Sequence, residues 1–518
     1  MKFKIVVTAL AFVLANNINA QNEADAIRYS AQSIGSTARS YGLAGAFGSV
    51  GADLSCAAFN PAGMARFRKS QFGFSTSFYN VKNTTAYINK DLADKKFNFN
   101  LPNVGFAFVI PGEDFENKKP TGFVSFTLGF NMNRLNNLHN RSLYNAVNSS
   151  SSITQNWADR ANEFGYTPSE FSRYSIEHLA YSTWAIDKDT LSPTPRYISA
   201  YGANAPIKVN QLGSMLTKGA INDYNVSFAA NYQHKFLFGI SVGAKSVRYI
   251  SNSTFLETDD RNSPVKDIKS VELNEYVKTS GLGLNAKLGV NFSPNEYVRI
   301  GYAFHSPTVY NLKDSYNYTI ATAYDYGARD PFDSLRVGQK MSTPSAIYNY
   351  KVTSPSRNIF SLALIDKNTG FIALDLEVVN YATANLSPTK ANASDYAFTQ
   401  ENLRIRSLLN SSAINLRLGA EYIMDNYRFR AGYARNPSPY RNGAVPYVKD
   451  LVNNIYTLGF GIKTRAYAFD IAYVNSRSAF YTVPYTLDAT NLANGQSYAV
   501  TNNIRSSNIV FSVGLPIN

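Results

Sequence analysis

Stretches of about ten residues that alternate apolar with small or polar side chains recur along the chain from Phe72 to Leu515. The clearest stretch runs from Leu282 to Phe292, where every even position is apolar and every odd position is Gly, Asn or Lys. Successive side chains of a β-strand point to opposite faces, so this stretch presents one apolar and one polar face. Many such strands separated by turn residues are typical of a transmembrane β-barrel whose apolar face contacts lipid.

The alternation predicts about fourteen strands, an even number as in single-chain bacterial barrels. The predicted strands cover 70–80, 99–110, 121–132, 223–233, 236–250, 281–292, 297–306, 357–366, 369–380, 412–423, 427–435, 452–463, 466–476 and 505–515. Short turns at 234–235, 293–296, 366–368, 424–426 and 464–465 alternate with long excursions at 133–222, 251–280, 307–356, 381–411, 436–451 and 477–504. Short turns of such barrels face the periplasm, so we expect both termini there and the long loops outside the cell.

Composition supports an all-β membrane protein over other classes. The mean hydropathy of −0.23 is too polar for a bundle of membrane helices, and no run of about eighteen apolar residues follows Ala20. The single cysteine, Cys56, excludes an intramolecular disulfide. The net charge is +14, but Lys and Arg are scattered rather than clustered, which argues against a nucleic-acid partner.

Three segments follow from this pattern. Residues 1–20 combine two lysines, a short apolar core and a small-residue end, and we expect a signal peptide cleaved after Ala20. Residues 21–69 are rich in Gly and Ala, and a barrel this wide needs a filler, so they are predicted to form an N-terminal hatch inside the lumen. Residues 70–518 would then form the barrel.

The strand parity opposite the apolar row predicts which charges face the lumen. The predicted lumen cations are Lys245, Lys287, Arg299, Arg417, Arg428, Arg430 and Lys463, and the predicted lumen anions are Asp375, Glu377, Glu421 and Asp470. At mid-strand, a charge on the lipid face would cost about 2–4 kcal/mol. These residues form either an ion-pair network that fills the barrel or an electropositive site for an anionic ligand.

One motif in the N-terminal segment resembles a known family. A glycine-alanine run from Tyr41 to Phe47, then Asp53, then Asn60, Pro61, Ala62, Gly63 and Met64, is similar to the hatch of FadL-type outer-membrane transporters. Stretches 415–422 and 427–433 resemble a late strand pair of that family. The family carries long-chain fatty acids and, in some members, aromatic hydrocarbons such as toluene.

The resemblance implies passive, ligand-gated diffusion. A hydrophobic ligand would enter from the outer loops, shift the hatch and leave sideways through a wall opening beside a kinked third strand, here 121–132. Asn60, Pro61 and Ala62 would make the moving contact, with Gly63 and Asp53 as further hatch residues. Sideways exit keeps an apolar ligand out of periplasmic water.

Loop 133–222 is the predicted site of ligand capture. Ile153, Trp157, Ala161 and Phe164 recur at helical spacing before Gly165, and Thr167 to Glu170 reads as a capping box opening a second helix through Phe171, Tyr174, Leu179 and Trp184. Trp157, Phe164, Phe171 and Trp184 are the candidate capture residues. Their apolar stripes could equally pack on each other and on the barrel rim.

No enzyme motif emerges from the sequence. The four histidines are scattered, and metalloprotease, P-loop, nucleophile-elbow and CxxC patterns do not occur, so we predict neither catalysis nor a metal or cofactor. The predicted partners are a hydrophobic small molecule, the bilayer and lipopolysaccharide, and the barrel is expected to be a monomer. The alternative is a similar barrel that serves as a protein-interaction or secretion platform through its long loops.

Overall fold

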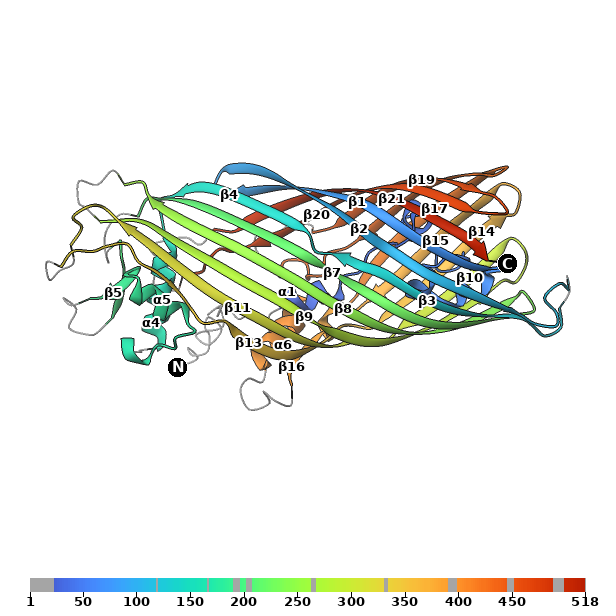
Figure 1. The fold of residues 1–518 in the computed structure, drawn as a ribbon, viewed down its shortest axis with the longest axis horizontal. Helices are drawn as coiled ribbons and strands as arrows, with labels where there is room; N and C mark the ends of the chain where they lie inside the picture. The colour runs from blue at the N-terminus through green and yellow to red at the C-terminus, as the bar shows by residue number, and fades with distance from the viewer. Residues whose placement is uncertain are drawn as a thin grey trace, which may run out of the picture.

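The computed structural model describes residues 23–117, 120–164, 167–189, 196–201, 207–261, 267–329, 334–389, 398–444, 451–487 and 498–517. The predicted signal peptide lies outside these ranges. Within them, fourteen antiparallel wall segments close into a barrel (Figure 1), which confirms the predicted fold class and strand number. We call each wall segment a stave; it consists of one strand or of two strands end to end. The barrel closes where β1 (Ser70–Tyr87) pairs with β21 (Val500–Ile517), from Ser70 opposite Ile517 to Ala86 opposite Thr501.

Most staves are single strands. In chain order these are β1, β2 (Lys90–Pro111), β7 (Val209–Tyr232), β8 (Phe236–Asp259), β9 (Ile268–Phe292), β17 (Ala413–Met424), β18 (Tyr427–Asn436), β19 (Asn453–Lys463), β20 (Ala468–Thr482) and β21. The other staves are interrupted and consist of β3 (Phe123–Asn137) with β4 (Asn140–Asn148), β10 (Val298–His305) with β11 (Val309–Tyr324), β13 (Ala346–Thr353) with β14 (Arg357–Asp366), and β15 (Gly370–Val379) with β16 (Asn385–Pro388).

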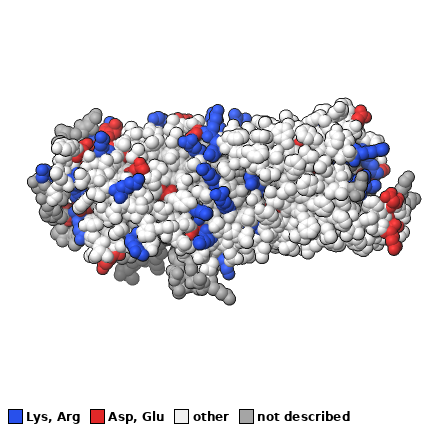
Figure 2. Space-filling model, in the orientation of Figure 1, with Lys and Arg blue, Asp and Glu red and all other residues white. Residues whose placement is uncertain are grey.

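An apolar belt surrounds one half of the barrel. Its outward side chains include Phe78, Val242, Leu284 and Leu458, which are exposed although they are large and apolar. In Figure 2, the half of the molecule that contains the C-terminus is almost free of charge between its charged tip and a band of Lys and Arg near mid-length. Exposed apolar surface this extensive is unfavourable in water and suits contact with lipid.

The sequence analysis underestimated how far the strands extend. The predicted strand 70–80 lies within the longer β1, and 223–233 covers only the second half of β7. The predicted loop 307–356 holds the whole of β11, the short β12 (Lys340–Ser342) and β13. Beyond the belt the outer face is polar, so apolar alternation ends although the backbone ladder continues. Residues 81–98, which the sequence analysis left outside the predicted strands, continue β1 and β2 up to a tight turn at Ile88 and Asn89, both with positive φ.

The long loop between β4 and β7 folds over the open end opposite the C-terminus (Figure 1). It contains α4 (Ile153–Phe164), η2 (Pro168–Glu170), α5 (Ile176–Ser182), β5 (Ile186–Lys188) and β6 (Tyr197–Ser199). The first predicted helix is confirmed. The start of the second was wrong, because the capping box opens only the short η2, the backbone is extended at Phe171, and α5 begins after its N-cap Ser175.

Candidate functional site

The segment before β1 lies inside the barrel. It forms α1 (Glu23–Ser30), α2 (Ala38–Gly42), α3 (Cys56–Phe59) and η1 (Pro61–Arg66), most of whose residues are buried. η1 packs against β7, β8 and β9, and α2 packs against β19 and β20. We call residues 23–69 the hatch segment.

The turn at Asn60, Pro61 and Ala62 fits against two glycines of the wall. Gly239 of β8 and Gly289 of β9 are cross-strand partners. A Cβ atom at Gly239 would lie 2.3 Å from Pro61, and one at Gly289 would lie 2.0 Å from Asn60 Oδ1. The Asn60 Oδ1 atom accepts the Ala62 N–H at 3.1 Å, which caps η1. Close approach of turn and wall therefore requires glycine on the inner face.

Asp53 organises the loops of the hatch segment. Its carboxylate accepts hydrogen bonds from the Thr37 hydroxyl at 2.9 Å, the Ser55 N–H at 2.8 Å and the Ser55 hydroxyl at 2.5 Å. Thr37 is the N-cap of α2 and forms a capping box with Ser40. Asp53 thus joins the start of α2 to the loop before α3. Gly63 packs on the other side of this loop, since a Cβ there would lie 2.7 Å from Cys56 Sγ.

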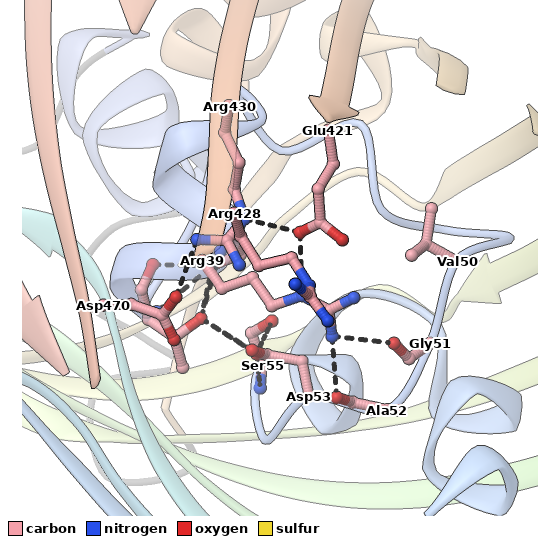
Figure 3. A network of polar contacts seen from close by, with 12 residues as sticks. Arg39, Val50, Gly51, Ala52, Asp53, Ser55, Glu421, Arg428, Arg430 and Asp470 are labelled. Atoms are coloured by element: carbon pink, nitrogen blue, oxygen red, sulfur yellow. Dashed lines mark hydrogen bonds and ion pairs between the residues drawn. The ribbon is translucent and has the colours of Figure 1, made fainter. Parts of the chain in front are cut away.

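A charged network ties the hatch segment to β17, β18 and β20 (Figure 3). Arg39 of α2 donates to the Ala52 carbonyl at 2.9 Å and lies 3.6 Å from Glu421. Arg430 bridges Glu421 and Asp470, each at 2.6 Å. A buried ion pair needs additional hydrogen bonds to offset its desolvation, and this chain of alternating charges provides them.

Further contacts hold the hatch segment to other strands. The Asp375 carboxylate on β15 accepts the N–H groups of Phe47 at 3.0 Å and Gly48 at 2.9 Å. His305 at the end of β10 contacts the Phe59 carbonyl at 2.7 Å, and Arg299 donates to the Val50 carbonyl at 3.1 Å. The segment is therefore bonded to the inner wall on several sides.

The predicted lumen charges lie in different environments. Lys245, Lys287, Arg417, Arg430, Asp375, Glu377 and Glu421 are buried, Arg299, Arg428 and Asp470 are half-buried, and Lys463 is exposed at the short-turn rim. Glu377 pairs with Arg417 and also with Arg357, which the sequence analysis did not select.

Two buried lysines share one aspartate. Lys287 Nζ donates to Asp223 and to Asn225, each at 2.5 Å. Lys245 is the cross-strand partner of Asp223, and its Nζ donates to the Thr308 hydroxyl at 2.8 Å. The cluster thus sets two buried lysines beside a single carboxylate, which pairs with Lys287.

The ladder between β2 and β3 ends partway along the barrel. It runs from Pro111 opposite Ser125 to Asn103 opposite Asn133. Beyond that pair, the described residues 90–102 and 134–148 form no ladder pair with each other, although β2 continues along β1 and β4 continues along β7. Pro102 has no N–H to donate, and β3 is bulged between Arg134 and Asn136. We call this line the seam.

The hatch segment contacts the seam at the end where the β2–β3 ladder stops. The Ser33 N–H donates to the Leu135 carbonyl at 2.5 Å, and the Ser36 hydroxyl donates to Asn133 Oδ1 at 2.7 Å. Asn103 donates to the same oxygen at 2.7 Å. A hatch backbone group therefore binds a β3 carbonyl beside the point where pairing with β2 has ended.

Polar side chains bridge the rest of the seam. Asn137 donates to Asn98 Oδ1 at 3.1 Å, Arg141 lies 3.0 Å from Asp94, and Lys90 donates to Asn145 Oδ1 at 3.1 Å. Outside the seam, Phe99, Leu101 and Phe130 expose apolar side chains. A path through the seam would thus join the lumen to the apolar belt.

The predicted capture residues are mostly packed. Trp157 is fully buried and Phe171 nearly so, in a cluster with α4, α5 and the outer parts of β8, β9 and β11. Trp184 is half-buried, and the guanidinium carbon of Arg336 lies 4.5 Å from the centre of its ring. The side chain of Phe164 is not among those that the structure describes. This packing agrees with the alternative that the helices stabilise the rim, and ligand capture stays a prediction.

The described residues contain neither a candidate membrane-spanning helix nor a candidate metal site. No helix there is long and apolar enough to cross a bilayer. Nor does any group of His, Cys, Asp and Glu in those ranges have an arrangement that could hold a metal ion.

Solved structures with a similar fold include a FadL homologue and a toluene transporter. A FadL homologue of Pseudomonas aeruginosa matches over 93% of this chain and 99% of its own, with a TM-score of 0.53 and 13% identity. The toluene transporter TodX of P. putida matches over 93% of this chain and 98% of its own, with a TM-score of 0.50 and 10% identity. No protein-family model and no curated protein matches the sequence. The chain therefore has the FadL-type fold.

Sequence reasoning missed several residues of this site. Asp223, His305, Arg357 and the glycine pair Gly239–Gly289 were not selected, and neither was the seam. The glycines had a recognisable signal, since Gly289 stands at an inward position of a regular strand, where glycine marks a close approach of another backbone. The partners of the others become adjacent only when the barrel closes.

Substitution of Gly289 tests how the turn is held. Gly289→Ala should force Asn60 and Pro61 from the wall, because the new methyl group would overlap Asn60 Oδ1, and overpacking of this kind costs about 1–3 kcal/mol. We expect higher ion conductance in planar bilayers and a lower unfolding temperature. Gly122→Ala, where an added Cβ would meet only Asp114 Oδ2 at an ordinary contact distance of 3.8 Å, is the matched control. Identical conductance and unfolding for both variants would contradict the assigned contact.

Proposed function

We propose that this protein is an outer-membrane channel that passes hydrophobic small molecules from outside the cell to the apolar layer of the membrane. The channel is passive, and the hatch segment is its plug. The short turns at 234–235, 293–296, 366–368, 424–426 and 464–465 and the C-terminal end face the periplasm, and the band beyond the belt faces outward. The described chain begins inside the barrel, where Glu23 of α1 lies 3.4 Å from Arg404 in α6 (Thr399–Leu408) of an outer loop. The shared fold with hydrophobic-compound channels and the apolar belt support this assignment.

The seam is the observation on which the proposal depends. A ligand that crosses the wall between β2 and β3 breaks side-chain contacts but no ladder pair above Asn103 and Asn133. The hatch residues Ser33 and Ser36 contact β3 where the seam begins, so movement of the hatch segment and opening of the seam are coupled. Lateral exit keeps an apolar ligand out of water throughout.

The lysine cluster distinguishes two classes of ligand. A long-chain carboxylate places its charged group near Lys245 and Lys287, where one aspartate serves two cations. A neutral aromatic hydrocarbon gains nothing from this charge. The two classes therefore differ in how strongly their uptake depends on Lys245.

Membrane orientation can be tested by cysteine labelling. Asp91→Cys beside the β1–β2 turn should react with an impermeant maleimide on intact cells, whereas Asn368→Cys in a short turn should react only after lysis. The native Cys56 is buried, and its burial raises the pKa of its thiol, so it should stay unlabelled. Labelling of Asn368→Cys alone on intact cells would reverse the proposed orientation.

Crosslinking of the seam tests lateral exit. In a Cys56→Ala background, Asn98→Cys with Asn137→Cys, joined by a short bis-methanethiosulfonate, should abolish uptake of labelled hydrophobic compounds. A reductant should restore it, because the crosslink replaces the side-chain contact of this pair. The control joins Asn222→Cys to Ser246→Cys, a cross-strand pair within a complete ladder. Full uptake with the seam locked would exclude this exit, whereas no uptake even without the crosslink would favour the protein-platform alternative.

Substitution of Lys245 tests the ligand class. Lys245→Gln should reduce uptake of a long-chain fatty acid roughly tenfold, the effect of losing one charge-assisted hydrogen bond, and leave toluene uptake unchanged. Lys463→Gln, at the exposed rim, is the control. Equal effects of Lys245→Gln on both ligands would remove the carboxylate assignment while the channel assignment would stand.

A further inference from the structure

A row of positive charges crosses adjacent strands just above the apolar belt. Lys82 on β1 lies directly opposite Lys95 on β2 and Arg505 on β21, and Arg505 lies opposite Arg477 on β20. One strand further, Asn454 on β19 separates Arg477 from Arg435 on β18. We call these five cations the basic row. All five are exposed on the outer surface.

The charges of the basic row lack anionic partners. Within the described residues, none of the five forms an ion pair with a carboxylate. The neighbouring outward positions on β2, β1, β21 and β20 carry no acid either: they are Ala93, Thr84, Asn503 and Ala479 on one side and Phe97, Asn80, Ser507 and Asn475 on the other. Like charges directly opposite each other destabilise a sheet, so the row needs anions from outside the chain.

A groove lies within the basic row. It has a volume of about 380 Å³, and its lining includes Lys82, Arg477 and Arg505 together with the polar side chains Thr84, Asn454 and Asn503. Arginine and lysine side chains converging on one recess can bind a phosphate through several charge-assisted hydrogen bonds. No carboxylate lines the groove.

The height of the row on the barrel indicates the kind of anion. Toward the C-terminal half, one row of Asn, Ser, Phe and Tyr separates the cations from Phe78, Leu458 and Ile509 of the apolar belt. An anion at the groove would thus stand about four residues, some 13 Å along a strand, from Phe78, Leu458 and Ile509. That arrangement fits an amphiphile with its phosphate on the row and its acyl chains on the belt.

A second arc extends the band around the barrel. Exposed Arg248 on β8 and Lys313 on β11 both lie opposite Ser280 of β9, and Lys218 and Lys278 both lie opposite Ile250. Figure 2 shows the resulting band of Lys and Arg across the face in view. A band of this extent matches a charged layer that surrounds the protein, such as a leaflet of phosphorylated lipid.

We propose that the basic row, with the groove of Lys82, Arg477 and Arg505 at its centre, binds the phosphates of a phosphorylated glycolipid in the outer leaflet. The inference rests on the outer-membrane location in the proposed function. It concerns a lipid that stays on the outer wall, not the transported ligand. Its test measures lipid binding and is independent of uptake.

The experiment compares lipid binding by the purified, full-length barrel and two matched triple variants. One combines Lys82→Gln, Arg477→Gln and Arg505→Gln. The control combines Arg68→Gln, Lys235→Gln and Arg465→Gln, exposed cations toward the other end, so that both variants lose the same net charge. Native mass spectrometry in maltoside detergent measures retention of diphosphorylated lipid A and of the same lipid after removal of its phosphates.

The wild type and the control should retain the diphosphorylated lipid, and the groove variant should bind it roughly a hundredfold more weakly, because each cation near an anionic lipid surface contributes about a fivefold effect. Removal of the phosphates should weaken wild-type binding to the level of the groove variant. Equal binding by the groove variant and the wild type, or equal binding of the dephosphorylated lipid, would overturn the proposal.

Thermal unfolding gives a second readout. Without lipid, the groove variant should unfold at the same or a higher temperature than the wild type, because its row carries less repulsion. Diphosphorylated lipid A should raise the unfolding temperature of the wild type and of the control variant, but not that of the groove variant. An equal rise in unfolding temperature with inorganic phosphate would show that the groove binds a soluble anion and would overturn its assignment to a lipid. If the triple variant does not fold, Arg477→Gln should bind about fivefold more weakly, and unchanged binding by it would refute the site.

Discussion

Backbone hydrogen bonding is the constraint on which this structure depends. A strand that faces lipid has no water for its N–H and C=O groups, so the sheet must close on itself, as it does where β1 meets β21. The seam departs from this rule, and other groups there take the place of the missing ladder hydrogen bonds. Pro102 has no N–H, Ser33 of the hatch segment binds the Leu135 carbonyl, and Asn98 and Asn137 bond through side chains. The seam is therefore weaker than a ladder without being open.

The hatch segment is held by shape as well as by charge. Inward glycines such as Gly289 let the Asn60 turn touch the wall backbone, and the buried Asp375 carboxylate binds two of its N–H groups. Contacts of this kind allow only one close-packed arrangement of the hatch segment and the wall. Because such an interface is hardly compressible, it transmits a displacement instead of absorbing it. A shift of the segment therefore disturbs Ser33 and Ser36 at the seam, which gives the proposed ligand-dependent opening a physical route.

The sequence predicts whatever depends on local periodicity. Strand number follows from alternation, and parity correctly assigns Lys287, Arg417 and Arg430 to the buried face. Strand length does not follow, because above the belt both the water-facing and the inward surfaces are polar enough to hide the period. The start of α5 was misread because Phe171 packs into the loop core with an extended backbone. The seam and the Arg39–Glu421 contact join residues far apart in the chain, so only the closed barrel brings them together.

The seam and the basic row share strand β2, and this fixes the position of the proposed lateral exit relative to the charged row. On the outer face of β2, Lys95 belongs to the basic row, while Phe97, Phe99 and Leu101 below it are exposed beside the part of the seam that lacks a ladder. A lipid whose phosphate is bound at the row would lay its acyl chains over these side chains. A ligand crossing the wall there enters hydrocarbon below the charged layer, so it never passes the headgroups. Fixed charge above and an unladdered wall below thus separate the polar barrier from the exit.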